Sequence, residues 1–310
     1  MNSTLIQSIL QKNNIDPAST VTPFSSGQIN AVYDVAGTFV LKVEKSLDVV
    51  GHQSEILSLA RAAGAKVPVV VDAGTIDGVG YLLMTKISGR LLSQVWLGFD
   101  AAQKQSAMEQ LAQQLKILHG VSFDGYAIPR PLAFDSWKDA LCAYTDFSGV
   151  DVGGLDDRTR ENFLTLREFY ASHEYLLEDA GRPVLVHNDV HFDNVLYENG
   201  VITGIIDFDF ARQAPKDYEL WHILDFFQSP KYFVDKEAAS LWENFALTNE
   251  LGVLRSSYPE PFAVPDLASR IRLYVTEDIL STLKSGATGK FNEKVGAYFG
   301  GEWLESVLFG

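Results

Sequence analysis

The sequence has few of the features that mark a secreted or membrane protein. It contains a single cysteine, Cys142, so it can form neither an internal disulfide nor a zinc site made of several thiolates. No apolar run reaches the roughly 18 residues that a membrane-spanning helix needs. The start of the chain, MNSTLIQSIL, lacks the basic segment of a signal peptide. We therefore expect a cytoplasmic protein with no membrane partner.

Basic residues are also scarce. The chain of 310 residues has 25 Lys and Arg against 40 Asp and Glu, a formal net charge of −15. Such a surface repels phosphate backbones, so we expect no nucleic-acid partner. Residues 1–84 carry 5 basic and 7 acidic side chains (−2), whereas residues 85–310 carry 20 and 33 (−13). Either solvated helix faces account for this acidic excess, or it lines a cleft that attracts a cationic small substrate.

The first part of the chain has the pattern of a small antiparallel sheet. Hydrophobic residues make up 46% of the sequence, enough for a sizeable core. Short β-rich runs separated by turn residues predict a meander, and a longer run that ends at Gly64 predicts a helix. The expected elements are a helix over 2–13, strands over 21–24, 31–36 and 38–43, a helix over 48–63, and strands over 69–71 and 81–86 around a turn-rich segment at 73–78.

After Gly89 the pattern becomes mainly helical. Asp100 is a plausible N-cap for a long helix. Further helices are expected at about 157–180, 217–228, 235–250, 266–284 and 291–307, with short strands only within 183–211. The prediction is an α+β protein of two lobes: a sheet-based N-terminal lobe over 1–84, a hinge over 85–90 and a larger helical C-terminal lobe over 91–310.

The most informative stretch is HNDVHFDN at 187–194, followed by IIDFD at 205–209. An Asp, an Asn five residues later, a short hairpin and another Asp make up the acidic half of a phosphoryl-transfer site. Mg²⁺ prefers hard oxygen ligands, and Asn194 and Asp207 would supply an amide and a carboxylate oxygen. A separate carboxylate, Asp189, would accept the proton of the attacking hydroxyl.

A kinase also needs a basic half, and residues upstream supply it. Lys42 lies in the strand-like FVLKV, where it can reach nucleotide phosphates. Glu55, on the following helix, is expected to pair with Lys42 and hold it in position. The turn at 25–30 contains Ser26 and Gly27, whose backbone N–H groups are candidates to cover the phosphates.

These motifs together resemble the aminoglycoside phosphotransferase and choline kinase family. The resemblance covers about residues 20 to 225 and rests on Ser26-Gly27, Lys42, Glu55, Leu118-His119, the loop at 187–194 and Ile206-Asp207. It implies a protein-kinase-like fold and an enzyme that uses ATP or GTP with Mg²⁺. The roles that it implies are Asp189 as catalytic base, Asn194 and Asp207 as Mg²⁺ ligands, Lys42 on the phosphates with Glu55 as its partner, and backbone groups of Thr85 and Ile87 against adenine.

Other interpretations of the same loop remain open. His187, Asp189 and His191 alternate along an extended segment and could instead form a metal triad of a hydrolase. Taken alone, His187 is more typical of a histidine that braces the loop backbone. Asp217 precedes a predicted helix, which favours an N-cap or loop anchor.

The acceptor is expected to be the hydroxyl of a small polar molecule, such as an aminoglycoside. Choline, ethanolamine, homoserine and other metabolites are alternatives, because the fold and the catalytic loop do not encode the acceptor. Only nine residues separate Asp207 from Asp217, which leaves no room for the long activation segment of a protein kinase. A catalytically inactive pseudokinase is the rival from another class. The candidates for acceptor contacts are Asp193, Asp209, Glu219 and Trp221.

Overall fold

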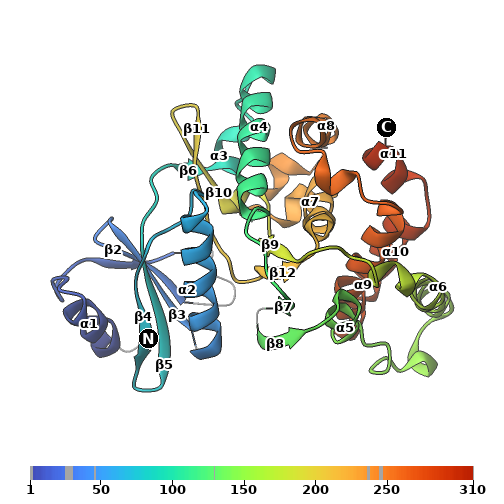
Figure 1. Cartoon of the computed structure of the whole chain (residues 1–310), viewed down its shortest axis with the longest axis horizontal. Coiled ribbons are helices and arrows are strands. Elements are labelled where there is room, and N and C mark those ends of the chain that lie inside the picture. Colours follow the sequence, from blue (N-terminus) through green and yellow to red (C-terminus); the bar gives the residue numbers. More distant parts are fainter. Residues whose placement is uncertain are drawn as a thin grey trace.

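The computed structural model describes residues 3–24, 31–44, 47–128, 130–235, 238–243 and 247–309. The turn with Ser26 and Gly27 therefore lies outside the described residues. In Figure 1 an antiparallel sheet occupies the left side of the molecule and a mainly helical region the right side. Among the described helices, none is both long and apolar enough to cross a membrane.

The N-terminal sheet has five antiparallel strands in the order β1-β2-β3-β5-β4. Their bounds are β1 Val21–Pro23, β2 Ala31–Val35, β3 Phe39–Glu44, β4 Val70–Ile76 and β5 Val79–Thr85. The segment at 73–78, predicted to be a turn, is mostly strand, because Asp77 (φ 52°) and Gly78 (φ 78°) alone reverse the chain. Positive φ at both central residues is the geometry of a tight two-residue hairpin.

One helix covers each face of this sheet. Helix α1 (Ser3–Lys12) packs on one face through Ile9 and Leu10, against Leu41 and Val43 of β3. Helix α2 (Leu47–Ala62) lies on the other face. Because side chains alternate along a strand, Lys42 points away from α1 and towards α2 and the second region. The fold thereby directs this lysine into the space between the two parts of the molecule.

The segment at 85–90, predicted to be a hinge, contains a position that only glycine fits. Gly89 has φ +118°, and a Cβ there would lie 2.9 Å from Thr203 Oγ1. The chain then forms β6 (Arg90–Leu91), which pairs with β10, so this segment is tied to the hairpin of β10 and β11.

The second region is built from helices around one apolar core. Its α-helices are α3 Leu92–Trp96, α4 Ala101–Leu118, α5 Trp137–Cys142, α6 Asp157–His173, α7 Glu219–Gln228, α8 Thr248–Ser257, α9 Leu267–Lys284, α10 Thr288–Phe299 and α11 Trp303–Phe309. Asp100 caps α4 as predicted: its side chain accepts from the N–H of Gln103, whose side chain in turn accepts from the N–H of Asp100.

Two small sheets within the helical region carry the loops of interest. One has the order β11-β10-β6 and the other β8-β7-β12-β9. Their remaining strands are β7 Tyr126–Ile128, β8 Arg130–Phe134, β9 Val184–Val186, β10 Val195–Glu198, β11 Val201–Ile205 and β12 Arg212–Ala214. The loop at 187–194 joins β9 to β10 and so links the two sheets.

Two of the predicted helices are wrong. A continuous helix over 235–250 is not formed, since the described part of that segment has a 3-10 turn at Ala239–Trp242 and α8 begins only at Thr248. The helix expected over 291–307 is two helices, α10 and α11, separated at Gly300 and Gly301. Glycine raises the cost of continuing a helix, and two in succession end α10.

Candidate active site

The loop between β9 and β10 is held in an unusual backbone conformation. Asn188 is buried and has φ 58°, a left-handed conformation that asparagine tolerates better than most residues. Its side chain is fixed as well, because Trp221 Nε1 donates to Asn188 Oδ1 over 3.0 Å. The turn closes at Phe192–Asn194, where the N–H of Asn194 bonds the carbonyl of His191.

Glu219 braces this loop from the start of α7. Its carboxylate accepts from the N–H of His187 and from the N–H of Asn188, each over 2.8 Å. His119, at the C-terminal end of α4, lies 3.4 Å from the same carboxylate. Burial alone would raise the pKa of Glu219, but the His119 contact and neighbouring groups lower it. Glu219 is only 1% exposed and both of its oxygens are bonded to the loop, so the structure gives it a bracing contact and shows no open face for the acceptor contact that was predicted.

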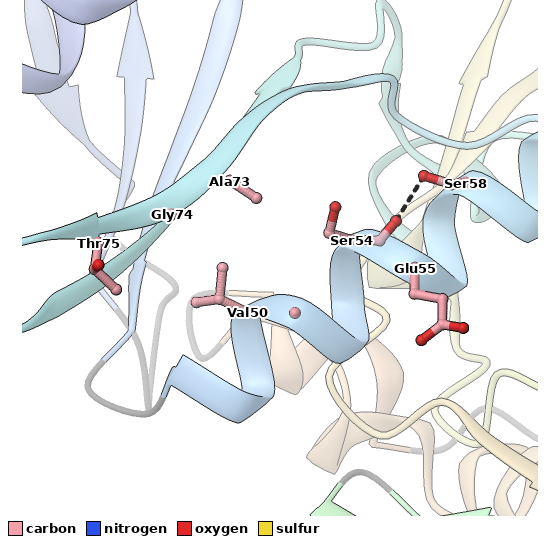
Figure 2. A pocket seen from close by; sticks show the side chains of 8 residues that line it. Val50, Ser54, Glu55, Ser58, Ala73, Gly74 and Thr75 are labelled. Atoms are coloured by element: carbon pink, nitrogen blue, oxygen red, sulfur yellow. Dashed lines mark hydrogen bonds between the residues drawn. The ribbon is translucent and has the colours of Figure 1, made fainter.

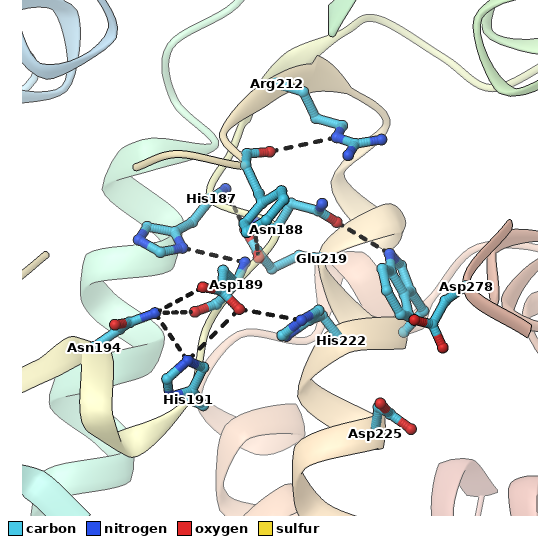
Figure 3. Close-up of polar contacts among 12 residues, drawn as sticks. His187, Asn188, Asp189, His191, Asn194, Arg212, Glu219, His222, Asp225 and Asp278 are labelled. Carbon is cyan, nitrogen blue, oxygen red and sulfur yellow. Dashed lines mark hydrogen bonds and ion pairs between the residues drawn. The ribbon is translucent and has the colours of Figure 1, made fainter. Parts of the chain in front are cut away.

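Asp189 lies where side chains from the loop and from α7 converge (Figure 3). Asn194 Nδ2 donates to its Oδ2 over 3.0 Å, and the imidazole Nε2 atoms of His222 and His191 lie 3.1 and 3.6 Å from its Oδ1. Burial alone would raise the pKa of Asp189, but the hydrogen bond to His191 and the nearby imidazoles lower it to about 2. The carboxylate is therefore ionised at neutral pH and able to accept a proton.

His187 braces the backbone of the loop, which is the role that the sequence analysis favoured for it. It is fully buried; its Nε2 lies 2.9 Å from the carbonyl of Ile206, and its Nδ1 accepts from the N–H of Asp189. Both ring nitrogens are thus engaged, and the metal triad with Asp189 and His191 is not formed. Throughout the described ranges, no group of three or more His, Cys, Asp or Glu residues could hold a metal ion.

Lys42 reaches the two aspartates that follow β11. Its ammonium is bonded to Asp209 and lies 3.8 Å from Asp207 Oδ1. Burial lowers the pKa of Lys42, although the carboxylates of Asp207 and Glu44 partly offset this effect. Asp209 also accepts from Gln53 Nε2 over 2.8 Å, so a strand, a helix and the loop after β11 meet here.

The predicted partner of Lys42 is wrong. Gln53, which is buried, is the residue of α2 that reaches this cluster, whereas Glu55 is exposed. In Figure 2 the Glu55 side chain projects from α2 away from β4, and the carboxylates that pair with Lys42 in the described part of the chain are Asp207 and Asp209. Two residues along a helix turn a side chain by about 200°, so Gln53 and Glu55 face opposite ways.

Asn194 and Asp207 have the donor set and the placement that suit a magnesium ion. The N–H of Ile206 bonds the carbonyl of Asn194 over 2.9 Å, which sets Asp207 beside Asn194. The amide nitrogen of Asn194 contacts Asp189, so its oxygen faces the other way. Asp207 is exposed and has φ 63°. An amide and a carboxylate oxygen are ligands that Mg²⁺ accepts readily.

The remaining candidates have varied surroundings. Burial raises the pKa of Asp193, and its Oδ1 has no hydrogen-bond partner among the described residues. Trp221 is buried and holds Asn188. Thr85 ends β5, with its N–H bonded to the carbonyl of Val69, and Ile87 follows in the hinge. Asp217, expected to be an anchor, is buried in an ion pair with Arg270 at 2.7 Å.

Sequence reasoning missed His222 and Gln53. His222 lies three residues after Glu219 on α7, so both project towards the catalytic loop from one helix face. That spacing is a signal that was present in the sequence. Gln53 precedes the buried Ile56 and Leu57 by three and four residues, and so belongs to the buried side of α2.

Comparisons with known proteins show the family and the fold of the chain. The model of the phosphotransferase enzyme family matches residues 20–251. An aminoglycoside 3'-phosphotransferase from Escherichia coli is 27% identical over 182 residues, which are 56% of this chain and 64% of that protein. The chain thus spans a little under two thirds of the length of that curated relative.

Solved structures share the whole fold. The aminoglycoside phosphotransferase APH(4)-Ia has a TM-score of 0.69 at 17% identity, with 99% of this chain and 98% of that chain covered. The GDP complex of aminoglycoside 2'-phosphotransferase-IIIa has a TM-score of 0.66 at 20% identity, with 99% and 97% covered. The chain therefore belongs to the phosphotransferase enzyme family and has the two-lobed, kinase-like α+β fold that its sequence predicted.

Proposed function

We propose that the protein is a kinase that transfers the γ-phosphoryl group of ATP or GTP to a hydroxyl group of a small polar molecule. The observation that carries this proposal is the convergence, between the two parts of the molecule, of a buried lysine with the Asp189, Asn194 and Asp207 side chains. No single segment supplies this set. It requires β3, the loop after β9 and the loop after β11.

Asp189 would orient the acceptor hydroxyl and take its proton. Its ionised carboxylate is fixed by Asn194 and His222, so it need not reorganise when the acceptor arrives. Phosphoryl transfer needs mainly positioning and charge stabilisation, which fits a carboxylate held in one orientation.

Lys42 would bind the nucleotide phosphates. Asp209, which also accepts from Gln53, holds the Lys42 ammonium, a task that the sequence had suggested for Glu55. Asn194 and Asp207 would hold Mg²⁺, which when bound neutralises charge on the phosphates. Backbone groups of Thr85 and Ile87 remain the candidates to meet the base at the hinge.

The structural neighbours suggest which class of acceptor to test first. A thermostable mutant of APH(4)-Ia forms a ternary complex with ADP and hygromycin B, and another neighbour binds GDP and kanamycin. These neighbours make aminoglycosides the first acceptors to test and support a purine nucleotide as donor.

The test is ADP or GDP release by the full-length protein with Mg²⁺ and a panel of hydroxylated acceptors, in wild type and Asp189→Asn. We expect Asp189→Asn to lower kcat by about 10²–10⁴-fold, the usual contribution of a general base, with nucleotide affinity nearly unchanged. Asp146→Asn is a matched control, because the Asp146 pKa is also about 2 but its carboxylate is exposed and pairs with Lys284. Retention of more than about a tenth of kcat in Asp189→Asn would contradict the role of Asp189.

A further inference from the structure

His191 lies beside the proposed base and beside one of the proposed magnesium ligands. Its Nε2 is 3.0 Å from Asn194 Nδ2 and 3.6 Å from Asp189 Oδ1, and Figure 3 shows both contacts. The side chain is 13% exposed, and its ring packs near those of Phe226 and Phe233, at 6.2 and 5.5 Å between centroids. Apolar packing therefore holds the imidazole, and Nε2 makes its polar contacts.

One ring nitrogen cannot serve both of these neighbours. With a hydrogen on Nε2 the ring would donate to Asp189, whereas with the hydrogen on Nδ1 it would accept from the amide of Asn194. Nδ1 of His191 is buried and has no hydrogen-bond partner among the described residues, so the contacts of Nε2 decide where the hydrogen lies.

The shorter of the two contacts is the one with Asn194. Its 3.0 Å falls in the range usual for hydrogen bonds donated by N–H groups, about 2.7–3.2 Å. A hydrogen on Nε2 would also place two donors opposite each other at that distance. Both points favour the form of His191 that carries its hydrogen on Nδ1.

The orientation of the Asn194 amide determines what this residue can bind. The NH2 group and the oxygen of an amide are alike in size, so hydrogen bonds rather than packing distinguish the two orientations. Besides the His191 contact, Asn194 Nδ2 lies 2.9 Å from the carbonyl oxygen and 3.0 Å from Oδ2 of Asp189. These acceptors keep the nitrogen on their side and turn the oxygen, the atom that Mg²⁺ accepts as a ligand, to the other.

His191 differs from Asp189 in what happens to it during the proposed reaction. The Asp189 carboxylate would take the proton of the acceptor hydroxyl, which weakens it as an acceptor for the amide. His191 takes no part in that transfer, so its lone pair stays available to Asn194. An amide with two hydrogens can bond one of them to each neighbour.

We propose that His191 is a positioning residue: with its hydrogen on Nδ1, it accepts from Asn194 and keeps the amide oxygen of Asn194 turned towards Mg²⁺. The inference rests on the proposed function, because it concerns a metal ligand of the same site. Residues that orient metal ligands typically contribute about 10–100-fold to metal affinity or activity.

Binding of a non-hydrolysable ATP analogue tests this role without turnover. Calorimetry with the full-length protein compares the affinity for the analogue in excess Mg²⁺ and in excess chelator, and the ratio of the two is the gain due to the metal. His191→Phe keeps a flat ring beside Phe226 and Phe233 but has no ring nitrogen. We expect this variant to lower the gain about tenfold and to leave the affinity in chelator unchanged.

His191→Gln separates the hydrogen bond from the packing. Its side-chain oxygen can accept from Asn194 although the ring is lost, so the gain should stay within about threefold of wild type. An unchanged gain in His191→Phe, or a loss in His191→Gln as large as in His191→Phe, overturns the proposal. His173→Phe is the matched control: His173 ends α6 and stacks on Phe169 at 4.0 Å between ring centroids, and its replacement should not change the gain.

A measurement on the wild-type protein keeps the test open if a variant fails to fold. Nitrogen NMR of the protein labelled with ¹⁵N-histidine, at about pH 8 where an ordinary imidazole is neutral, shows which ring nitrogen carries the hydrogen. The His191 signals are assigned through their short proton–proton distances to the Phe226 and Phe233 rings. We expect the hydrogen on Nδ1; a hydrogen on Nε2 means that the ring donates to Asp189, and overturns the proposal.

The two levels of the hypothesis fail differently. A wild-type affinity for the analogue that does not depend on Mg²⁺ would contradict the metal role in the proposed function. A gain in wild type that His191→Phe retains would leave that function standing and overturn only the role of His191.

Discussion

Glu219→Gln tests whether the loop at 187–194 depends on a single buried carboxylate. In the structure Glu219 accepts two backbone N–H groups, from His187 and Asn188, and faces His119. Glutamine has nearly the same shape but only one accepting oxygen at its end. Its amide nitrogen would therefore face a backbone N–H or the imidazole of His119, and one buried donor would lose its partner.

The expected cost follows from these contacts. An unsatisfied buried donor costs about 1–3 kcal/mol, and the remaining N–H···O bond loses the strength that an ionised acceptor gives it. We expect a loss of about 2–3 kcal/mol in the free energy of unfolding. For a region of this size each kcal/mol corresponds to about 2–4 °C, so Tm should fall by roughly 4–12 °C. Because the loop carries Asp189, kcat should fall as well.

Calorimetric unfolding and steady-state kinetics together check this reasoning. Glu305→Gln is the matched control, since Glu305 forms a surface ion pair with Arg272 at 2.6 Å and its loss should cost less than about 1 kcal/mol. If Glu219 contacted the acceptor instead, Glu219→Gln would raise the acceptor KM and leave Tm and kcat unchanged. That outcome would refute the bracing role.

Three further predictions concern other contacts of the site and its supports. Lys42→Met should lower kcat with Mg-ATP by at least about tenfold, because the phosphates lose their buried cation; wild-type kcat would rule out that role. Arg270→Met leaves the buried Asp217 carboxylate without its ion pair, so chemical denaturation should show a loss of about 3–5 kcal/mol, and a change under 1 kcal/mol would contradict it. Burial lowers the pKa of His222 below its ordinary value of 6.5. Its burial therefore costs no free energy of unfolding above about pH 6.5, and the free energy of unfolding declines as the pH falls below that value. His222→Gln should remove that part of the decline, and an identical pH dependence in the variant would disprove it.

The proximity of Asp189, Asn194 and Asp207 could be predicted because it depends on local structure. Asp189 and Asn194 are five residues apart, and the hairpin that returns Asp207 to them has two clear strands and a tight turn. The strand around Lys42 has enough β-branched and apolar residues to place the lysine on a face. The spacing of residues along the sequence is enough to predict that the loop residues lie close together and which face of the strand carries Lys42.

The partner of Lys42 could not be predicted in the same way, because it depends on the rotation of α2 about its axis. Gln53 and Glu55 are both polar, and a carboxylate is the more usual partner of a lysine. The buried side of α2 runs through Gln53, Ile56 and Ala60, with spacings of three and four residues. Packing of that side against the sheet and the core carries Gln53 inwards and leaves Glu55 in solvent.

Among the sequence signals, net charge said least about the acceptor, because many of the carboxylates form ion pairs or hydrogen bonds within the protein. Asp209 Oδ1 is bonded to Lys42 and Gln53, and Glu219 is bonded to the loop at 187–194, so part of the negative charge is already paired within the protein. Asp225 and Asp278 line a cavity beside His222, but Lys294 lies between them. A sum over 226 residues cannot reveal that Lys294, which comes from α10, pairs with both of these carboxylates. The net charge of a sequence therefore does not tell how many carboxylates remain unpaired near Asp189, because ion pairing depends on the folded arrangement.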